Sequence, residues 1–163
     1  KEYRRQRQMC IRDRYKRAYN IISKIMFSEY TNPVNKGLEG LTWDGNNQNL
    51  FAAKEMKDVT ITRANMISND MGIDKIIDPV AKSLKDVSGL HYHTPTSSLL
   101  ILSHESPKII EVNNEGRITD RLYLESGWSG LTESVPQAEG ITLDYNGYLY
   151  IVSEPNLFYR FAK

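Results

Sequence analysis

Residues 39–55 read EGLTWDGNNQNLFAAKE, residues 88–105 read SGLHYHTPTSSLLILSHE, and residues 139–154 read EGITLDYNGYLYIVSE. All three carry a glutamate or serine, a glycine, an apolar run, a polar turn, a second apolar run and a glutamate. Their glycines, Gly40, Gly89 and Gly140, are 49 and 51 residues apart. A sequence that repeats at such a period is typical of a protein built from stacked structural units.

Each repeat predicts short β-strands separated by polar turns. Asn146-Gly147 between two apolar runs is a strong hairpin signal, because both residues tolerate positive φ. About four antiparallel strands in roughly 40–50 residues describe one blade of a β-propeller. We therefore predict an all-β chain of about three four-stranded blades. The expected strands are 41–43, 50–53, 59–62, 89–92, 99–103, 109–112, 118–124, 141–143, 148–153 and 157–161.

Two segments outside the repeats have weaker patterns. Residues 15–27 fit helical and alternating spacing alike, and a short apolar run cannot be decided by its period alone. Residues 64–86 interrupt the repeats. Within them we expect a short helix that reaches Leu84, with Asp78 as its N-cap and Pro79 as its first residue.

The repeat glycine stands at the start of the first strand predicted for each blade. In a propeller that strand lines the central channel, where the blades crowd together, and a residue without a Cβ permits close approach there. The residue before the glycine would then point toward the channel mouth. Stacked blades cover both faces of their inner strands, so we expect the apolar runs 99–102 and 149–152 to be buried on both sides.

The composition is that of a soluble globular chain. It has 163 residues, of which 40% are hydrophobic and 25% charged, and no apolar stretch approaches the ~20 residues that span a bilayer. The formal net charge is +1, yet residues 1–17 hold eight Lys or Arg. A basic arm of this kind favours nucleic acid or an acidic membrane as a partner, unless it is only a solvated tail.

The basic arm has a third explanation. Residues 4–13, RRQRQMCIRD, match the in-frame translation of a transposon adapter used in sequencing libraries. We therefore assign residues 1–14 to that adapter and exclude them from the fold. Without them the 21 basic and 20 acidic residues fall to 15 and 18, and nucleic acid is no longer an expected partner. Cys10, the only cysteine, lies in the same segment. We expect the natural protein to begin upstream, with residues 15–35 forming a linker or partial blade.

Three stretches resemble the SdiA-regulated family: NKGLEGLTWD at 35–44, DVSGLHY at 86–92 and PQAEGITLDYNGYLYIVSEPNLFYRF at 136–161. The resemblance covers residues 36–163, and its third motif is long and specific. It implies a bacterial protein with a six-bladed β-propeller, of which this chain would be the C-terminal half. A half-ring exposes sheet faces at its cut edges, so residues 15–163 expressed alone should be poorly soluble or oligomeric.

The resemblance also implies a location. Members of the family often carry an N-terminal membrane anchor, with the propeller outside the cytoplasm. We therefore expect a protein of the cell envelope, periplasmic or otherwise extracytoplasmic, that meets the membrane only through an anchor absent from this sequence. The family has no established activity, so the resemblance implies a fold more firmly than a function.

The repeated carboxylates are the first candidate site. Calcium accepts several oxygen ligands in irregular geometry, and related propeller hydrolases hold such an ion at the channel mouth. Glu39 and Glu139 are the predicted metal ligands. The alternative is that the glutamates bond backbone amides or face solvent, since the sequence has no compact metal motif. The candidate channel-mouth residues are Glu39, Ser88, Glu139, Glu55, Glu105 and Glu154.

The histidines are a second candidate group. His91 and His93 alternate on one strand face and could bind a metal, but the sequence offers no third ligand, so ordinary bonded or exposed histidines are the alternative. His104 lies in the run SHES at 103–106. Adjacent residues of a strand point to opposite faces, so this run cannot form a catalytic triad with itself.

Aromatic side chains in the first and third repeats are a third candidate. They could stack against a ligand, or they could belong to the blade core. The residues concerned are Trp43, Tyr148, Tyr150, Phe158 and Tyr159.

Two functions from different classes remain. The first is a non-enzymatic binding or scaffold propeller of the bacterial cell envelope, whose partner is an unidentified small ligand or envelope protein. The second is a calcium-dependent propeller hydrolase acting on a phosphate ester or a lactone. Carboxylates converging on one point would favour the hydrolase, because such a group needs a cation to stay ionised. Scattered, individually bonded glutamates would favour the binding protein. We expect no catalytic activity from this fragment itself.

Overall fold

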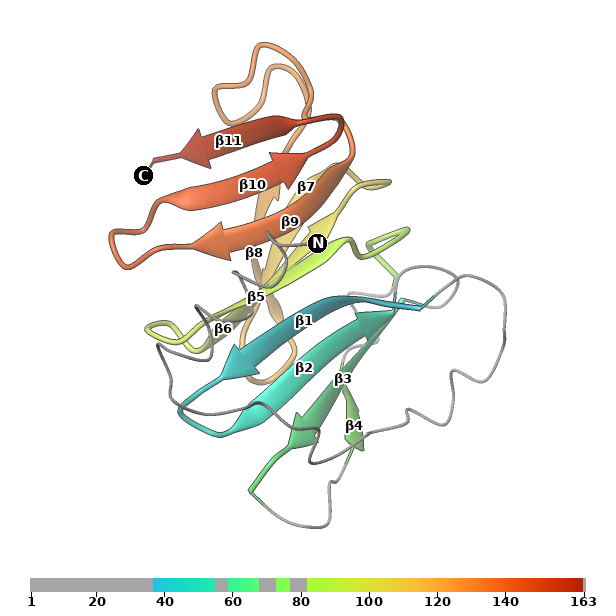
Figure 1. The fold of residues 1–163 in the computed structure, drawn as a ribbon, viewed down its shortest axis with the longest axis vertical. Helices are drawn as coiled ribbons and strands as arrows, with labels where there is room; N and C mark the ends of the chain where they lie inside the picture. Colours follow the sequence, from blue (N-terminus) through green and yellow to red (C-terminus); the bar gives the residue numbers. More distant parts are fainter. Residues whose placement is uncertain (1–36, 55–58, 68–72, 77–81, 163) are drawn as a thin grey trace, which may run out of the picture. The chain divides into compact units, whose positions relative to one another are not determined.

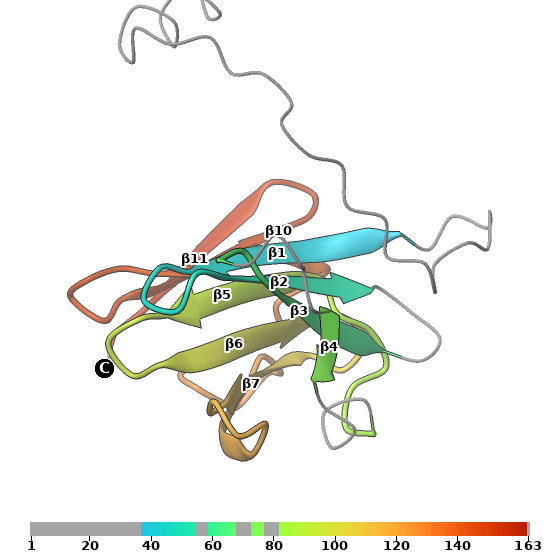
Figure 2. The same ribbon diagram turned by 90° about the horizontal axis from the view of Figure 1, so that it is seen from below.

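The described part of the chain forms three antiparallel β-sheets, seen in two orientations in Figures 1 and 2. The structure, a computed structural model, describes residues 37–54, 59–67, 73–76 and 82–162. The first sheet has the order β1-β2-β3-β4, the second β5-β6-β7-β8 and the third β11-β10-β9. Their bounds are β1 Leu38–Asp44, β2 Asn49–Lys54, β3 Thr60–Asn65, β4 Ile73–Ile76, β5 Gly89–His93, β6 Ser98–Ser103, β7 Lys108–Val112, β8 Ile118–Tyr123, β9 Ala138–Leu143, β10 Leu149–Ser153 and β11 Leu157–Phe161.

Aspartates at the ends of β1 and β9 close the first hairpin of their sheets. The Asp44 carboxylate accepts the backbone N–H groups of Asn46 and Asn47, at 3.0 and 3.2 Å, and the Asn47 amide at 2.7 Å. Asp144 accepts two backbone N–H groups of its own turn, each at 2.9 Å. Burial raises the pKa of Asp44, but these hydrogen bonds outweigh it and lower the pKa overall.

The sheets stack through their first strands. β1 contacts β5, and β5 contacts β9, so β5 lies between the other two (Figure 1). The order of the sheets along the chain is therefore also their order in space, as in successive propeller blades.

Two apolar cores fill the spaces between neighbouring sheets. The run 99–102 shows how one strand serves both: Leu99 and Ile101 point into the first core, whereas Leu100 and Leu102 point into the second. This confirms that the run is covered on both faces. The first core contains Phe51, Ala53, Val59, Ile61, Leu84, Val87, Leu90, Tyr92, Leu99, Ile101, Ile110 and Val112; the second contains Leu102, Ile109, Leu124, Val135, Ala138, Leu149 and Ile151.

Some expectations need correction. The run 149–152 is covered on one face only, because Leu149 and Ile151 join the second core while Val152 is 50% exposed. Residues 73–76, expected to lie in an interruption, form β4. The third sheet has three strands among the described residues rather than four. The ambiguous segment 15–27 and the first turn of the expected helix at 78–84 lie outside the described residues.

Two of the repeat glycines, Gly40 and Gly89, provide room for the neighbouring blade. A Cβ built on Gly40 would lie 2.7 Å from Cγ of Leu90, which comes from the second sheet, and 3.3 Å from Cβ of Ala53. A Cβ on Gly89 would lie 3.2 Å from a methyl of Ile141 in the third sheet. The expected close approach is thus present, and it is made mainly by side chains of the next sheet.

The Gly40→Ala substitution should destabilise the protein by about 2 kcal/mol, because the added methyl forces Leu90 out of a packed position. Gly45→Ala is the matched control, since a Cβ there would meet nothing closer than 3.5 Å. Urea unfolding of both variants measures the difference. Equal stability of the two would contradict the packing described.

Candidate functional site

The residues before the repeat glycines have different surroundings. Glu39 and Glu139 are exposed, whereas Ser88 is 8% exposed and its Oγ has no hydrogen-bond partner. Among the described residues, Ser88 is the only one whose side chain has a buried polar atom without a hydrogen-bond partner. The three positions are therefore not a ring of equivalent ligands.

Glu139 lies in an acidic neighbourhood drawn from all three sheets. Partial burial is the largest cause and raises the pKa of Glu139, whereas the positive charge of His104 lowers it. The carboxylates of Glu154, Asp86 and Glu39 raise the pKa further. Glu39, Glu139 and Glu154 are three of the residues predicted from the sequence to lie at one channel mouth. The charges of Glu39 and Glu154 both act on Glu139, and the channel mouth itself stays a prediction.

Asp86 belongs to this neighbourhood but is not among the site residues predicted from the sequence. It is 4% exposed and accepts a hydrogen bond from the Ser103 hydroxyl. It also accepts the backbone N–H groups of His104, at 3.2 Å, and Glu105, at 2.9 Å. These three bonds commit its carboxylate to holding the β6–β7 turn.

The strand register corrects the alignment of the second repeat. Gly89 pairs with Leu102 and Gly140 pairs with Val152. Two residues further on stand His104 in the second repeat and Glu154 in the third. The structural equivalent of Glu154 is therefore His104 and not Glu105, so the second repeat has a base where the sequence comparison placed an acid.

The described residues do not form the metal site that was predicted from the sequence. Among the described residues, no three His, Cys, Asp or Glu side chains are grouped closely enough to hold an ion. Glu39 and Glu139 thus have no such third ligand there, and Glu55 lies outside the described residues. Calcium binding stays a prediction.

The histidines make hydrogen bonds within and between blades. Nδ1 of His93 bonds the Thr96 hydroxyl at 2.7 Å, and Nδ1 of His91 lies 3.4 Å from the Thr142 hydroxyl of the next sheet. Partial burial lowers the pKa of His91, and the neighbouring His93 lowers it further. Both histidines hold local structure in this arrangement.

The aromatic candidates divide between surface and core. The rings of Tyr150 and Phe158 stack with centroids 5.8 Å apart, and Phe158 is 65% exposed. The Arg160 guanidinium lies 5.1 Å from the Tyr148 ring centroid. Tyr159 packs against the second core. Trp43 is 46% exposed and belongs to the first sheet, whereas the other aromatic candidates belong to the third sheet or its first hairpin.

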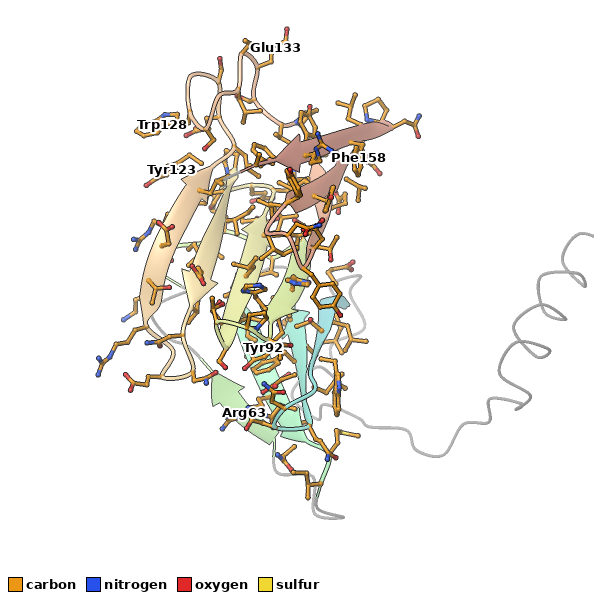
Figure 3. All side chains as sticks on the ribbon, turned by 90° about the vertical axis from the view of Figure 1, so that its left-hand side faces the viewer. Arg63, Tyr92, Tyr123, Trp128, Glu133 and Phe158 are labelled. Carbon is orange, nitrogen blue, oxygen red and sulfur yellow. The ribbon has the colours of Figure 1, made fainter. Side chains whose placement is uncertain are left out.

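A cavity of about 470 Å³ opens between the first and second sheets, and we call it the asparagine cavity. Its wall includes the rings of Phe51 and Tyr92, which stack at 5.4 Å with 12° between their planes. Figure 3 shows Tyr92 on the second sheet and Arg63 on the first, and both line it. The lining residues are Asp44, Asn47, Asn49, Phe51, Arg63, Asn65, Tyr92, Leu99, Val112, Asn113 and Asn114.

Five asparagines from the turns and strand ends of two sheets line this cavity. The Asn65 amide donates to Oδ1 of Asn49 at 2.9 Å and to the carbonyl of Asn47 at 3.2 Å. Oδ1 of Asn113 accepts two backbone N–H groups at 3.0 Å, and Oδ1 of Asn114 accepts the Tyr92 hydroxyl at 3.4 Å. Within the described part of the chain, the Nδ2 groups of Asn113 and Asn114 donate to no protein acceptor. Both remain available to a ligand.

A second cavity of about 630 Å³ lies between the second and third sheets. It combines apolar side chains such as Leu100 and Phe161 with Glu111, Asp120 and Arg121. The Glu111 carboxylate already accepts the Ser98 hydroxyl at 2.5 Å. This cavity has one asparagine, Asn146, and therefore lacks the concentration of amides seen in the first.

The stacked sheets, joined through their first strands, define a segment of a β-propeller, and we number the sheets blades 1 to 3. The chain belongs to the SdiA-regulated family, because the sequence model of that family matches residues 4–162. The match includes most of the segment assigned to an adapter, so the adapter origin stays a prediction. No helix in the described part of the chain is long and apolar enough to cross a membrane.

Solved structures agree on the fold. A chain of the nidogen/laminin complex is 19% identical, with a TM-score of 0.57 over 74% of this chain and 41% of its own. A streptogramin B lyase is 15% identical, with a TM-score of 0.52 over 81% of this chain and 43% of its own. Both are β-propeller proteins. This chain therefore spans less than half the length of each.

The raised pKa of Glu139 predicts a pH effect on stability. The folded state keeps this proton to higher pH than the unfolded state, so its contribution is lost as pH rises from the ordinary value of 4.5 through the raised value. Glu139→Gln should therefore be stabilising at neutral pH and lose that advantage at acid pH. Urea unfolding at both pH values measures this, with Glu133→Gln in the β8–β9 connection as control. An advantage of Glu139→Gln that did not change with pH would contradict the electrostatic account.

Proposed function

We propose that this protein is a non-enzymatic binding propeller and that the asparagine cavity holds its ligand. The convergence of five asparagines on one cavity between two blades carries the proposal. Binding cavities in proteins typically have volumes of about 300–1,000 Å³, and a few placed polar groups fix the ligand. A cavity of about 470 Å³ suits a molecule the size of one or two sugar rings.

The chemistry of the cavity favours a neutral, hydroxyl-rich ligand. Carboxamides both donate and accept hydrogen bonds, as a hydroxyl group does, so the two kinds of group complement one another. The two stacked rings of Phe51 and Tyr92 offer an apolar wall for the C–H face of such a ligand. The lining holds one carboxylate, Asp44, and one guanidinium, Arg63, so its formal charges cancel. We therefore propose a small sugar or polyol.

The roles of the acids also support a binding protein over an enzyme. Asp44 and Asp144 close hairpins, Asp86 holds the β6–β7 turn, and Glu111 bonds Ser98. Each of these carboxylates accepts at least one hydrogen bond that holds local structure, which supports a structural role. The repeat glutamates are not among these four acids.

We also propose that the protein acts in the bacterial cell envelope, outside the cytoplasm. Membership of the SdiA-regulated family supports this, through the anchored organisation that the resemblance implies. Fractionation of cells that express the gene with its upstream reading frame tests the location. Recovery of the protein in the cytoplasmic fraction would contradict it.

Neutral mono- and disaccharides should bind the protein, with saturable chemical-shift changes at the Phe51 and Tyr92 rings. Asn114→Ala should weaken binding about tenfold, because one hydrogen bond to the ligand, of about 1.4 kcal/mol, is lost. Titrations followed by NMR measure both. Asn156→Ala, an exposed turn asparagine outside the cavity, should leave affinity unchanged.

Two results would contradict the proposal. One is that no neutral sugar or polyol saturates the protein while amino acids or phosphorylated sugars do. The other is that Asn114→Ala and Asn156→Ala bind equally well, since the ligand would then occupy another place.

One observation favours a calcium-dependent hydrolase as a second candidate. The carboxylates of Glu154, in the same blade, and Glu39, in blade 1, both raise the pKa of Glu139. A divalent cation would relieve the repulsion among them and could activate a bound water. The substrate would be a phosphate ester or a lactone.

A calcium titration separates the two functions. The binding proposal predicts no calcium-specific change in the midpoint of thermal unfolding, whereas a metal site in the folded state must raise it. Magnesium at equal concentration is the control for ionic strength. A rise with calcium alone, abolished by Glu139→Gln, would favour the hydrolase and count against the present proposal.

A further inference from the structure

The second cavity, between blades 2 and 3, is the structural counterpart of the asparagine cavity. Phe51 and Leu100 each stand two residues before the partner of a repeat glycine, and each lines its own cavity. Arg63 pairs with Phe51, and Glu111 pairs with Leu100. Both of these partners line the cavities as well. The two cavities therefore repeat one architecture with different side chains, so the second selects a ligand of different chemistry.

Both blades that enclose the second cavity belong to the described part of the chain. The wall comes from residues between 93 and 162. A fourth strand beside β11 would stand where β8 stands in blade 2, and β8 contributes no residue to the asparagine cavity. By the same geometry, a fourth strand in blade 3 would not occupy the second cavity.

Two carboxylates stand opposite each other on the wall of this cavity. Glu111 in β7 pairs directly with Asp120 in β8, and both residues line the cavity. Within the described part of the chain, neither carboxylate forms an ion pair. Arg121 also lines the cavity, but it pairs with Ile110 of the first core, so its side chain leaves β8 on the other face. Like charges that face each other across two strands repel, and a bound cation would relieve this repulsion.

A chain of hydrogen bonds supplies a third acceptor. The Ser98 hydroxyl donates to the Glu111 carboxylate at 2.5 Å, so its oxygen accepts from the Thr96 hydroxyl at 2.7 Å. The Thr96 hydroxyl has no second proton to give, so it accepts from Nδ1 of His93 at 2.7 Å. The neutral His93 ring therefore carries its proton on Nδ1, which leaves Nε2 as an acceptor. His93, Thr96 and Glu111 all line the cavity.

The rest of the wall is largely apolar. Four of its side chains also pack against the second core, and they come from both blades. They are Leu100, Leu122, Leu143 and Phe161. At the position of the Tyr92 hydroxyl in the asparagine cavity the second cavity has Leu143, three residues after its repeat glycine as Tyr92 is. An apolar surface beside three acceptors suits a ligand with a hydrocarbon body and a hydrogen-bond-donating head.

We propose that the second cavity binds a primary amine with an apolar body, with its ammonium group between Glu111 and Asp120 and its hydrocarbon against the leucines. An ammonium group has three N–H donors and no acceptor, which matches the three acceptors on the wall. Its hydrogen bonds to carboxylates are charge-assisted and about twice as strong as neutral ones. The cavity volume of about 630 Å³ lies within the usual range of ligand sites. This site is separate from the asparagine cavity and does not depend on the ligand proposed there.

Isothermal titration calorimetry of the complete 163-residue chain with three six-carbon probes tests the proposal. Hexylamine, hexanol and hexanoate share one hydrocarbon body and differ in the charge of the head group at neutral pH. Hexylamine should saturate one site per chain, hexanol should bind about tenfold more weakly, and hexanoate should not bind. Methyl chemical shifts of Leu122 and Leu143 during the hexylamine titration locate the site.

Two variants test the role of the carboxylates. Glu111→Gln and Asp120→Asn should each weaken hexylamine binding about tenfold, because each removes one charge-assisted hydrogen bond. Glu115→Gln is the matched control, since Glu115 lies outside the cavity and its carboxylate contacts the exposed Arg117 at 3.2 Å. Circular dichroism checks that each variant keeps its β-structure.

Four results would overturn the proposal. Hexylamine may fail to saturate the chain at millimolar concentration, or hexanol may bind as tightly as hexylamine, which would make the cavity a purely apolar slot. Tighter binding of hexanoate would show that Arg121 decides the charge of the ligand. Equal affinity of Glu111→Gln, Asp120→Asn and Glu115→Gln for hexylamine would place the amine elsewhere.

Discussion

The close approach of neighbouring first strands is the constraint on which the rest of the structure depends. A Cβ on Gly40 would lie 2.7 Å from Cγ of Leu90, so this packing exists only because the residue is glycine. Gly89 gives Ile141 the same room one blade further on. With the inner strands held together, the outer strands diverge, and the two apolar cores fill the space between sheets. The same arrangement leaves a cavity where two blades separate beyond their hairpins.

The two ends of the inner strands have different chemistry as a result. Acids gather at the ends where the repeat glycines lie, but Asp86 is occupied by the turn that it holds. Amides gather at the opposite hairpin ends, where asparagines that shape the turns also line the asparagine cavity. Turn formation and ligand recognition thus draw on the same residue type. Asn113 illustrates this, because its Oδ1 closes a turn while its Nδ2 is left for other partners.

The three sequence repeats were sufficient to predict the blades, since glycine, alternating apolar residues and polar turns each have a local cause. β4 was missed because a four-residue strand has too few residues to show a period. Asp86 was missed because the equivalent positions in the other repeats are Gly37 and Gln137, so comparison of repeats could not find it. The asparagine cavity was also missed. Its asparagines are spread over residues 47–114, and only the packing of two blades brings them together.

The contact between Gly40 and Leu90 tests the central claim most directly. In a sample with labelled leucine methyl groups, the stacked blades predict strong nuclear Overhauser effects between the Leu90 methyl protons and the Gly40 Hα protons. The Leu41 methyl groups, which project from the opposite face of β1, should show none to blade 2. Absence of the first set of contacts, or their replacement by contacts from Leu41, would contradict the account.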